Sequence, residues 1–206
     1  MKIEPIKNNR KVRETNFHNK RYSSDPRTKL SLFYTLSSNT KRLYHNAIIN
    51  NSLDKRILEL GCGFGGFAQE LAEGGSIVSG IDISSVAIEQ AIKGSKEKNL
   101  NIDFKVMDAE NLDYRDCYFD TVYGTGILHH LDLKRSLSEV KRVLKVDGVC
   151  IFLEPLGHNP FINLFRLITP SLRTKDEHPL TEQDLEFILQ KFSSSRISHH
   201  HLTTFF

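Results

Sequence analysis

Short apolar runs alternate with amphipathic segments along most of the chain. The runs at residues 56–60, 77–81, 102–106, 120–124 and 148–154 are typical of buried strands. Between them, apolar residues recur every three or four positions, which predicts helices over 67–73, 85–98 and 133–144. Regular alternation of strand and helix is the pattern of βαβ units. We therefore expect an α/β fold with a doubly wound, mostly parallel sheet and helices on both of its faces.

Further elements are expected on both sides of this region. Residues 30–50 carry apolar side chains at spacings of three, four and seven, which predicts one or two capping helices. A helix over 181–192 begins with a capping box formed by Thr181 and Asp184, and a last strand follows at 196–204. These observations divide the chain into a basic N-terminal arm (1–29), N-terminal capping helices (30–51) and one domain (52–206).

Composition agrees with one folded domain and excludes several other classes. The chain has 206 residues, of which 39% are hydrophobic and 26% charged, so disorder is excluded. Its cysteines, Cys62, Cys117 and Cys150, form no C-x-x-C pair, so we expect reduced thiols, a cytoplasmic location and no structural zinc site. There is no apolar stretch long enough to span a membrane and no signal peptide.

Positive charge is concentrated at the N-terminus. Nine of the 28 Lys and Arg residues lie in residues 1–30, against three of the 25 Asp and Glu residues, which gives this segment +6 and the remainder −3. Such a segment can contact nucleic acid or anionic lipid, but it lacks the aromatic residues that are interleaved in nucleic-acid platforms. We expect a solvated tail and no nucleic-acid partner.

The strongest chemical signal is ELGCGFGGF at residues 59–67, directly after one predicted strand and directly before a helix. Gly61, Gly63 and Gly66 match G-x-G-x-x-G, in which the backbone turns tightly and offers its N–H groups to a ligand at a helix N-terminus. Asp82 ends the next strand, 21 residues after Gly61, where a carboxylate can bind both hydroxyls of a ribose. Together these features predict an adenosine-containing ligand.

Two more carboxylates narrow the choice of ligand. Glu59 directly precedes the glycine loop, where it would repel the pyrophosphate of a nicotinamide cofactor but suits a cationic ligand such as S-adenosylmethionine. Asp108 follows the third predicted strand, where it can accept a hydrogen bond from an adenine amino group.

From about Leu53 to Glu154, the sequence resembles the class I S-adenosylmethionine-dependent methyltransferases, a Rossmann-like family, and in particular its subset with an L-H-H-L motif. ELGCGFGG, IDIS, DAENL and FDTVYGTGILHHL occur in the family's order and at its spacing. The resemblance implies cofactor contacts from Gly61 and Gly63 at the methionine part, Asp82 and Ile83 at the ribose, Asp108 and Ala109 at the adenine, and Gly124 and Thr125 at the methionine carboxylate. The family often has Asn or Ser at these last two positions.

The resemblance also carries an expectation about the end of the sheet. The family adds an antiparallel seventh strand after the sixth, whereas this chain stops at Phe206, within or just after the sixth predicted strand. We therefore expect a sheet without the final family strand, either because the sheet is incomplete or because the polypeptide is a truncated form.

Three residues are candidates for proton transfer. His129 lies just after the fourth predicted strand, at the end of the sheet where active sites of open α/β folds gather, with Glu154 and His158 behind it. The histidines at 199–201 lie on a predicted strand, whose side chains alternate between faces, so they cannot all meet one ion. We expect no metal site.

The expected function is transfer of a methyl group from S-adenosylmethionine to a small-molecule acceptor. The apolar residues at 161–168 either pack into the core or cover a hydrophobic acceptor. They are also, with the basic arm, the candidate surfaces for weak membrane contact. Two alternatives stay open: a non-catalytic S-adenosylmethionine-binding module that recruits a partner, and a nicotinamide-dependent oxidoreductase.

Overall fold

A computed structural model describes residues 7–23, 38–155, 157, 167, 174, 176–192, 194–200 and 203–205. These residues build one sheet with the strand order β3-β2-β1-β4-β5-β7-β6. The strands are β1 (Arg56–Leu60), β2 (Ile77–Asp82), β3 (Asp103–Val106), β4 (Phe119–Thr125), β5 (Leu144–Glu154), β6 (Ser198–His200) and β7 (Thr203–Phe205). The first five in this order are parallel, and β7 is antiparallel to both of its neighbours. The expected fold class is confirmed.

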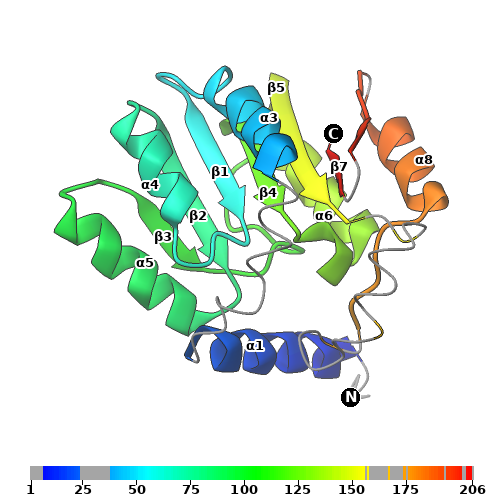
Figure 1. Cartoon of the computed structure of the whole chain (residues 1–206), viewed down its shortest axis with the longest axis horizontal. Helices are drawn as coiled ribbons and strands as arrows, with labels where there is room; N and C mark the ends of the chain where they lie inside the picture. The colour runs from blue at the N-terminus through cyan, green and yellow to red at the C-terminus, as the bar shows by residue number, and fades with distance from the viewer. Residues whose placement is uncertain are drawn as a thin grey trace.

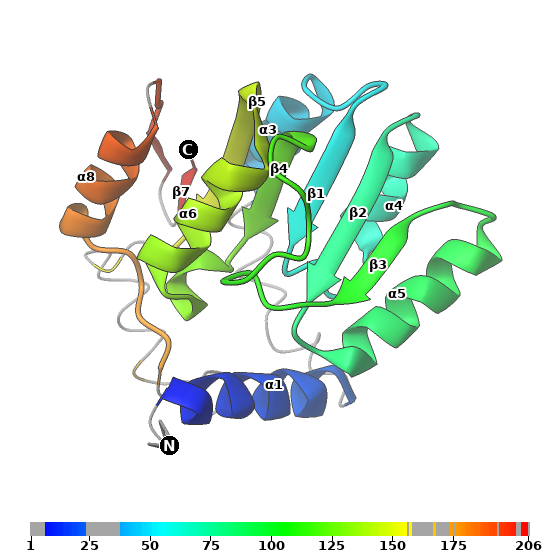
Figure 2. The ribbon, with the colours of Figure 1, turned by 180° about the vertical axis from the view of Figure 1, so that it is seen from behind.

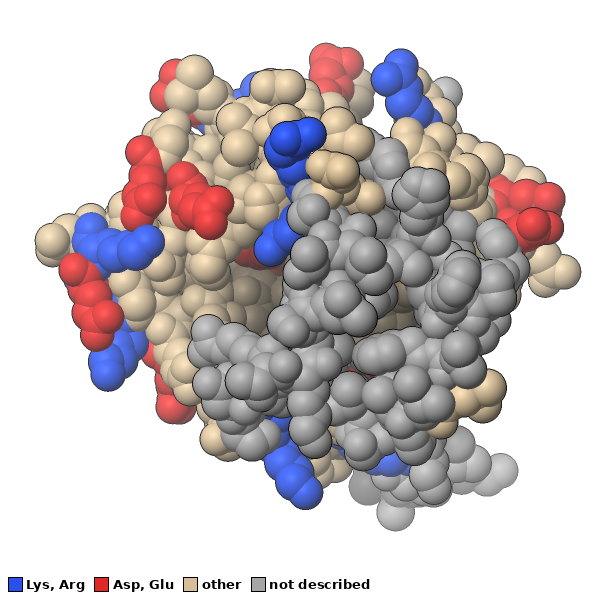
Figure 3. Space-filling model, in the orientation of Figure 1, with Lys and Arg blue, Asp and Glu red and all other residues tan. Residues whose placement is uncertain are grey.

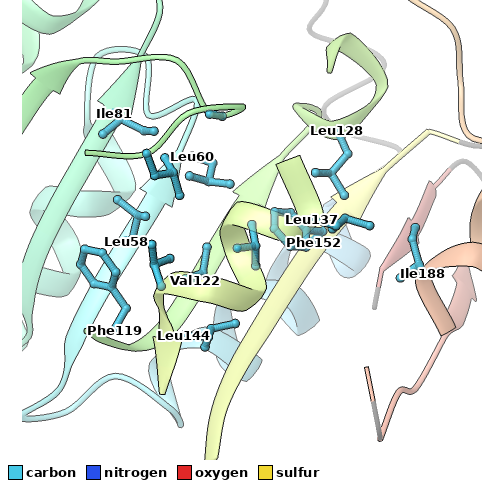
Figure 4. Close-up of a cluster of buried hydrophobic side chains, with 14 of the residues drawn as sticks. Leu58, Leu60, Ile81, Phe119, Val122, Leu128, Leu137, Leu144, Phe152 and Ile188 are labelled. Carbon is cyan, nitrogen blue, oxygen red and sulfur yellow. The ribbon is translucent and has the colours of Figure 1, made fainter. Parts of the chain in front are cut away.

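Helices cover both faces of this sheet (Figures 1 and 2). They are α1 (Lys7–Ser23), α3 (Ser38–Ile49), α4 (Gly66–Glu73), α5 (Ser85–Glu97), the short 3₁₀ helix η2 (Leu128–His130), α6 (Leu133–Val143) and α8 (Glu182–Lys191). One apolar cluster joins α3, α4 and α5 to the sheet, and the other joins α6 and α8 to its opposite face. Neighbouring residues of β1 point to opposite faces, so Ile57 belongs to the first cluster and Leu58 to the second. Figure 4 shows the second cluster.

The local sequence signals for these elements are largely confirmed. The side chain of Ser84 accepts a hydrogen bond from the backbone of Ala87 at the start of α5. The predicted capping box is present at α8, because Thr181 and Asp184 each accept a hydrogen bond from the backbone of the other. The fifth strand, predicted over 148–154, begins earlier, because β5 already starts at Leu144.

The expected number of strands is wrong. Residues predicted to form one strand over 196–204 instead contain two short antiparallel strands, and β7 pairs with β5. The described sheet therefore has seven strands rather than lacking the family's last one. The sequence between His200 and Thr203 has no Gly, Pro, Asn or Asp, so it contains none of the residue types that indicate a turn between two strands.

The N-terminal region also differs from the expectation of a solvated tail. Residues 7–23 form helix α1, which lies across the end of the sheet to which the parallel strands point (Figures 1 and 2). Of the capping helices expected within 30–51, the structure contains α3 at Ser38–Ile49, whereas residues 30–37 lie outside the described residues.

Two surface features complete the description. In Figure 3, acidic and basic side chains are interspersed over the side where α4 and α5 lie, so the described part of that face has no field of a single sign. No helix in the described part of the chain is both long enough and apolar enough to cross a bilayer. Of the segment 161–168, the structure describes only Leu167, which is exposed; the other residues lie outside the described part of the chain.

Candidate active site

The strand order reverses between β1 and β4, and the loops after these two strands meet there. This is the place where open α/β sheets bind their ligands. The loop after β1 has three residues with left-handed backbone, at Gly61 (φ +67°), Gly63 (φ +52°) and Gly65 (φ +69°). A Cβ atom at Gly61 would lie 2.9 Å from Cδ1 of Ile127, in the loop after β4. Glycine is therefore required at this crossing.

The third glycine of the motif is not the constrained one. Gly66, which matched G-x-G-x-x-G, is exposed, and a Cβ atom there would meet nothing within 4 Å. Its neighbour Gly65 is the tight position, because a Cβ atom there would lie 2.4 Å from Cζ of Phe104. The Gly65-Gly66 pair in the sequence was the available signal, and the pattern match selected the wrong member.

Asp82 connects the end of β2 to the glycine loop. Its two carboxylate oxygens accept hydrogen bonds from the backbone N–H groups of Gly63 and Ser84, each at 2.9 Å. Burial raises its pKa, although these two N–H groups act in the opposite direction. Ile83, next in the chain, is half-buried. Asp82, the residue predicted to bind the ribose, thus lies beside the loop predicted to bind the methionine part.

Helix α1 covers this part of the site, which the sequence reasoning missed. The hydroxyl oxygen of Tyr22 would lie 2.9 Å from a Cβ atom at Gly63, and its ring packs against Phe64 with centroids 4.8 Å apart. Ser84 donates a hydrogen bond to the side chain of Asn19 at 2.6 Å. Few residues of α1 are apolar, so its sequence gave no apolar stripe by which this packing could be predicted.

The basic residues of α1 pair with carboxylates after β3. Lys11 binds Asp108, and Arg10 binds Glu110. Asp108 also accepts a hydrogen bond from the backbone of Glu110 at 2.9 Å, and Ala109 between them is buried. The predicted adenine-binding residues are therefore present at the strand end, with a lysine of α1 against the carboxylate.

Glu59 lies in β1, just before the glycine loop. Its carboxylate accepts a hydrogen bond from the hydroxyl of Tyr123 at 3.1 Å. Burial, helped by the nearby charge of Asp82, raises the pKa of Glu59 to about 8. Gly124 pairs with Leu60 across the two central strands, and a Cβ atom there would lie 2.7 Å from Cγ2 of Ile127. Thr125 follows it and is exposed.

Two of the three candidates for proton transfer are in contact. Nδ1 of His129 lies 2.7 Å from Oε2 of Glu154, which is fully buried at the end of β5. Oε1 of Glu154 accepts two further hydrogen bonds, from the backbone N–H groups of Ile127 and Leu128. An ionised Glu154 can only accept, so in a neutral His129 ring the proton lies on Nδ1 and the lone pair on Nε2. Nε2 in turn lies 3.8 Å from Oε1 of Glu177. The third candidate, His158, lies outside the described residues.

Comparison with known proteins identifies relatives over the same region. A family described as "Methyltransferase domain" matches residues 58–152. A ubiquinone biosynthesis O-methyltransferase of Actinobacillus pleuropneumoniae is 31% identical over half of this chain, and the match spans 47% of that protein. The chain thus spans about half the length of this curated relative.

Solved structures extend the likeness beyond the matched region. A SAM-dependent methyltransferase from Methanosarcina mazei is 30% identical, with a TM-score of 0.62, and the match covers 77% of this chain and 93% of that one. The magnesium protoporphyrin IX methyltransferase of Synechocystis was solved with bound S-adenosylhomocysteine (SAH). It has a TM-score of 0.69, and the match covers 95% of this chain and 97% of that one. At 18% identity, this second likeness concerns the fold alone.

Proposed function

This chain belongs to the class I S-adenosylmethionine-dependent methyltransferases, and we propose that it transfers a methyl group to a hydroxyl oxygen of a small-molecule acceptor. The choice of a hydroxyl rests on the contact between His129 and Glu154. A general base is needed when the acceptor atom carries a proton at neutral pH, as a hydroxyl oxygen does, and His129 provides such a base beside the loops after the central strands.

The residues around the glycine loop fit the cofactor. S-adenosylmethionine, when bound, supplies a methyl group that is activated by the positive sulfur. Gly61 and Gly63 let the loop turn and pack closely against Ile127 and Tyr22, where a Cβ atom would collide, and their main chain is left to face the methionine part. Glu59, once ionised, suits the ammonium group of the ligand, and Gly124 and Thr125 border the same side. Asp82, with Ile83 beside it, serves the ribose, and Asp108 and Ala109 serve the adenine.

In this proposal, His129 accepts the acceptor's proton and Glu154 positions His129. Glu154 uses all its observed hydrogen bonds inside the protein, two to the backbone after β4 and one to Nδ1 of His129, so it orients the ring rather than meeting substrate. Nε2 of His129, which lies 3.8 Å from Oε1 of Glu177, then takes the hydroxyl proton. General bases typically contribute about 10²- to 10⁴-fold, and holding the acceptor oxygen in line with the methyl group supplies the rest.

A sizeable hydrophobic part on the acceptor is also proposed. The apolar composition of residues 161–168 and the name of the ubiquinone-pathway relative support it. Membrane contact through the basic arm is less well supported, because Arg10, Lys11 and Arg13 pair with Glu110, Asp108 and Asp176 within the chain. A cytoplasmic location stays a prediction from the cysteines.

Binding and turnover measurements test the proposal separately. Titration calorimetry on the full chain should detect S-adenosylhomocysteine and no NAD binding. Asp82→Ala should lower the affinity about 5- to 150-fold, the equivalent of about 1–3 kcal/mol. Asp82→Asn, which keeps the size of the side chain, guards against misfolding. Asp103→Ala, at the exposed start of β3, is the matched control and should bind like the parent.

Turnover is then measured as release of S-adenosylhomocysteine with phenols that carry apolar substituents. His129→Ala should slow turnover more than fivefold at unchanged cofactor affinity, whereas His45→Ala, in α3, should not. Unchanged affinity in both Asp82 variants would refute the cofactor site. A smaller rate loss in His129→Ala would refute its role as base. Tight binding with no turnover of any acceptor would favour a non-catalytic binding module.

A further inference from the structure

A second group of histidines and carboxylates lies between α1 and η2, directly beside the contact between His129 and Glu154, since the rings of His129 and His130 have centroids 4.2 Å apart. Glu14 and His18 stand four residues apart on α1, so they share one helix face. His130 comes from η2 and approaches the same carboxylate oxygen. Nε2 of His18 is 3.4 Å and Nδ1 of His130 is 3.3 Å from Oε2 of Glu14.

Two atoms of this group are buried and face each other without a well-formed hydrogen bond. Within the described part of the chain, Oε2 of Glu14 and Nδ1 of His130 meet no hydrogen-bond geometry, and their polar neighbours are each other and, for Oε2, Nε2 of His18. Glu14 is only 5% exposed, so these imidazoles are what offsets the cost of burying its carboxylate. The other oxygen of this carboxylate is held by the hydroxyl of Thr174, which fixes the direction of Oε2. The cluster thus directs one carboxylate oxygen and two imidazole nitrogens toward one point.

The spacing of the donor atoms fits a tetrahedral metal ion. With bonds of about 2.05 Å and tetrahedral angles, two ligand atoms on one zinc ion lie about 3.3 Å apart. In octahedral sites with bonds of about 2.1 Å, neighbouring ligands lie about 3.0 Å apart. The separations of 3.3 and 3.4 Å lie nearer the first value, and all three donor atoms lie within 4.8 Å of one another, so one ion can reach all of them. The rings of His18 and His130 meet at 76°, so both can approach one ion.

An outer partner is also present for one of the rings. A histidine that binds a metal ion through one nitrogen usually donates its other N–H to a carboxylate, which fixes the ring. Nε2 of His130 lies 3.9 Å from Oε2 of Glu177, within reach of a small side-chain rotation. This leaves Nδ1 of His130 for the ion.

We propose that Glu14, His18 and His130 form a binding site for a divalent transition-metal ion of the zinc class. Two imidazole nitrogens and one carboxylate oxygen are suitable zinc ligands, and a water molecule completes the four positions. The expectation of no metal, drawn from the cysteines and from the histidines at 199–201, did not consider these residues, which are far apart in the sequence. Because two ligands come from α1 and one from η2, the ion fastens α1 over the loop that carries His129.

The test uses the full chain and Zn²⁺ alone. In calorimetry with metal-free protein, we expect about one Zn²⁺ per chain, and at least tenfold weaker binding in Glu14→Gln and in His18→Gln. Both variants retain polar side chains, and Glu14→Gln keeps an oxygen for Thr174. His45→Gln, a histidine of α3 outside the cluster, is the matched control and should bind like the parent. To exclude a contribution from the histidines at 199–201, every measurement is repeated with all three replaced by Gln.

Two other readouts do not depend on activity. Co²⁺ should give the intense visible absorption of a tetrahedral site in the parent and lose it in Glu14→Gln. Zn²⁺ should raise the Tm of the parent but not that of the two ligand variants, because an ion that binds only the folded state stabilises it. Metal-free Tm values and far-ultraviolet circular dichroism identify any variant that fails to fold. The proposal is overturned if the parent binds no stoichiometric Zn²⁺, if binding disappears with the 199–201 histidines, or if folded ligand variants bind like the parent.

Discussion

At the scale of single residues, Gly65 and Gly66 are neighbours in the sequence but differ in what surrounds them. Gly65 has a left-handed backbone and no room for a Cβ atom beside Phe104, whereas Gly66 begins α4 and faces open space. Gly65→Ala should therefore destabilise the fold by about 2–4 kcal/mol, through backbone strain and overpacking. Gly66→Ala should be neutral or stabilise by up to about 1 kcal/mol, because alanine favours a helix. Urea unfolding of both variants measures the difference, and equal values would contradict the assignment of the tight position.

Glu59 gives the cofactor site a predicted dependence on pH. With its pKa raised to about 8, Glu59 is mostly protonated at neutral pH in the free protein. An ammonium group beside it favours the ionised form, so binding should release a proton. The affinity for S-adenosylhomocysteine should then rise from pH 6 to pH 8, by up to about tenfold per pH unit.

Calorimetry in two buffers of different ionisation enthalpy measures this proton release directly. Glu59→Gln, which cannot ionise, is the control and should give a flat profile over the same range. An affinity of the parent that does not change between pH 6 and pH 8 would show that Glu59 does not meet the ammonium group.

At the scale of elements, the parallel part of the fold was predictable because its strands are buried on both faces. Such strands are short apolar runs, and β1 was predicted at the residues where it is found. The antiparallel end was not predictable in the same way. Strands β6 and β7 are three residues each, and the chain between them contains no residue type that indicates a turn.

The same distinction explains which site residues could be found. Residues at and directly after the ends of β1, β2, β3 and β4 share one end of the sheet by topology, so the motifs alone placed Asp82 at the glycine loop and Asp108 at the same end of the sheet. The contact between His129 and Glu154 also follows, because β4 and β5 are neighbours. The contribution of α1 could not be deduced, since a polar helix packs through charge and hydrogen bonds that have no sequence period.

At the scale of the whole molecule, the uneven distribution of charge acquires a structural meaning. The N-terminal segment carries +6 and the rest of the chain −3. Blue side chains lie at the lower edge of Figure 3, where α1 runs in Figure 1. Arg10 and Lys11 meet Glu110, whose side chain is 2% exposed, and Arg13 meets Asp176. Opposite charges therefore hold α1 across the end of the sheet.

This attachment should be sensitive to salt and to the loss of one carboxylate. Arg10 and Lys11 are partly exposed, so we expect the pairs with Glu110 to contribute about 1–2 kcal/mol after screening by solvent. Hydrogen exchange of the α1 amides, measured with a chelator present, should become about 5- to 30-fold faster in Glu110→Gln. It should also become faster in the parent when NaCl is raised from 0.1 M to 1 M, which shortens the screening length to about 3 Å. Glu97→Gln, at the exposed end of α5, is the control and should leave α1 unchanged. If α1 stays equally protected in Glu110→Gln and in high salt, its attachment depends on contacts such as that between Tyr22 and Phe64, and charge only orients it.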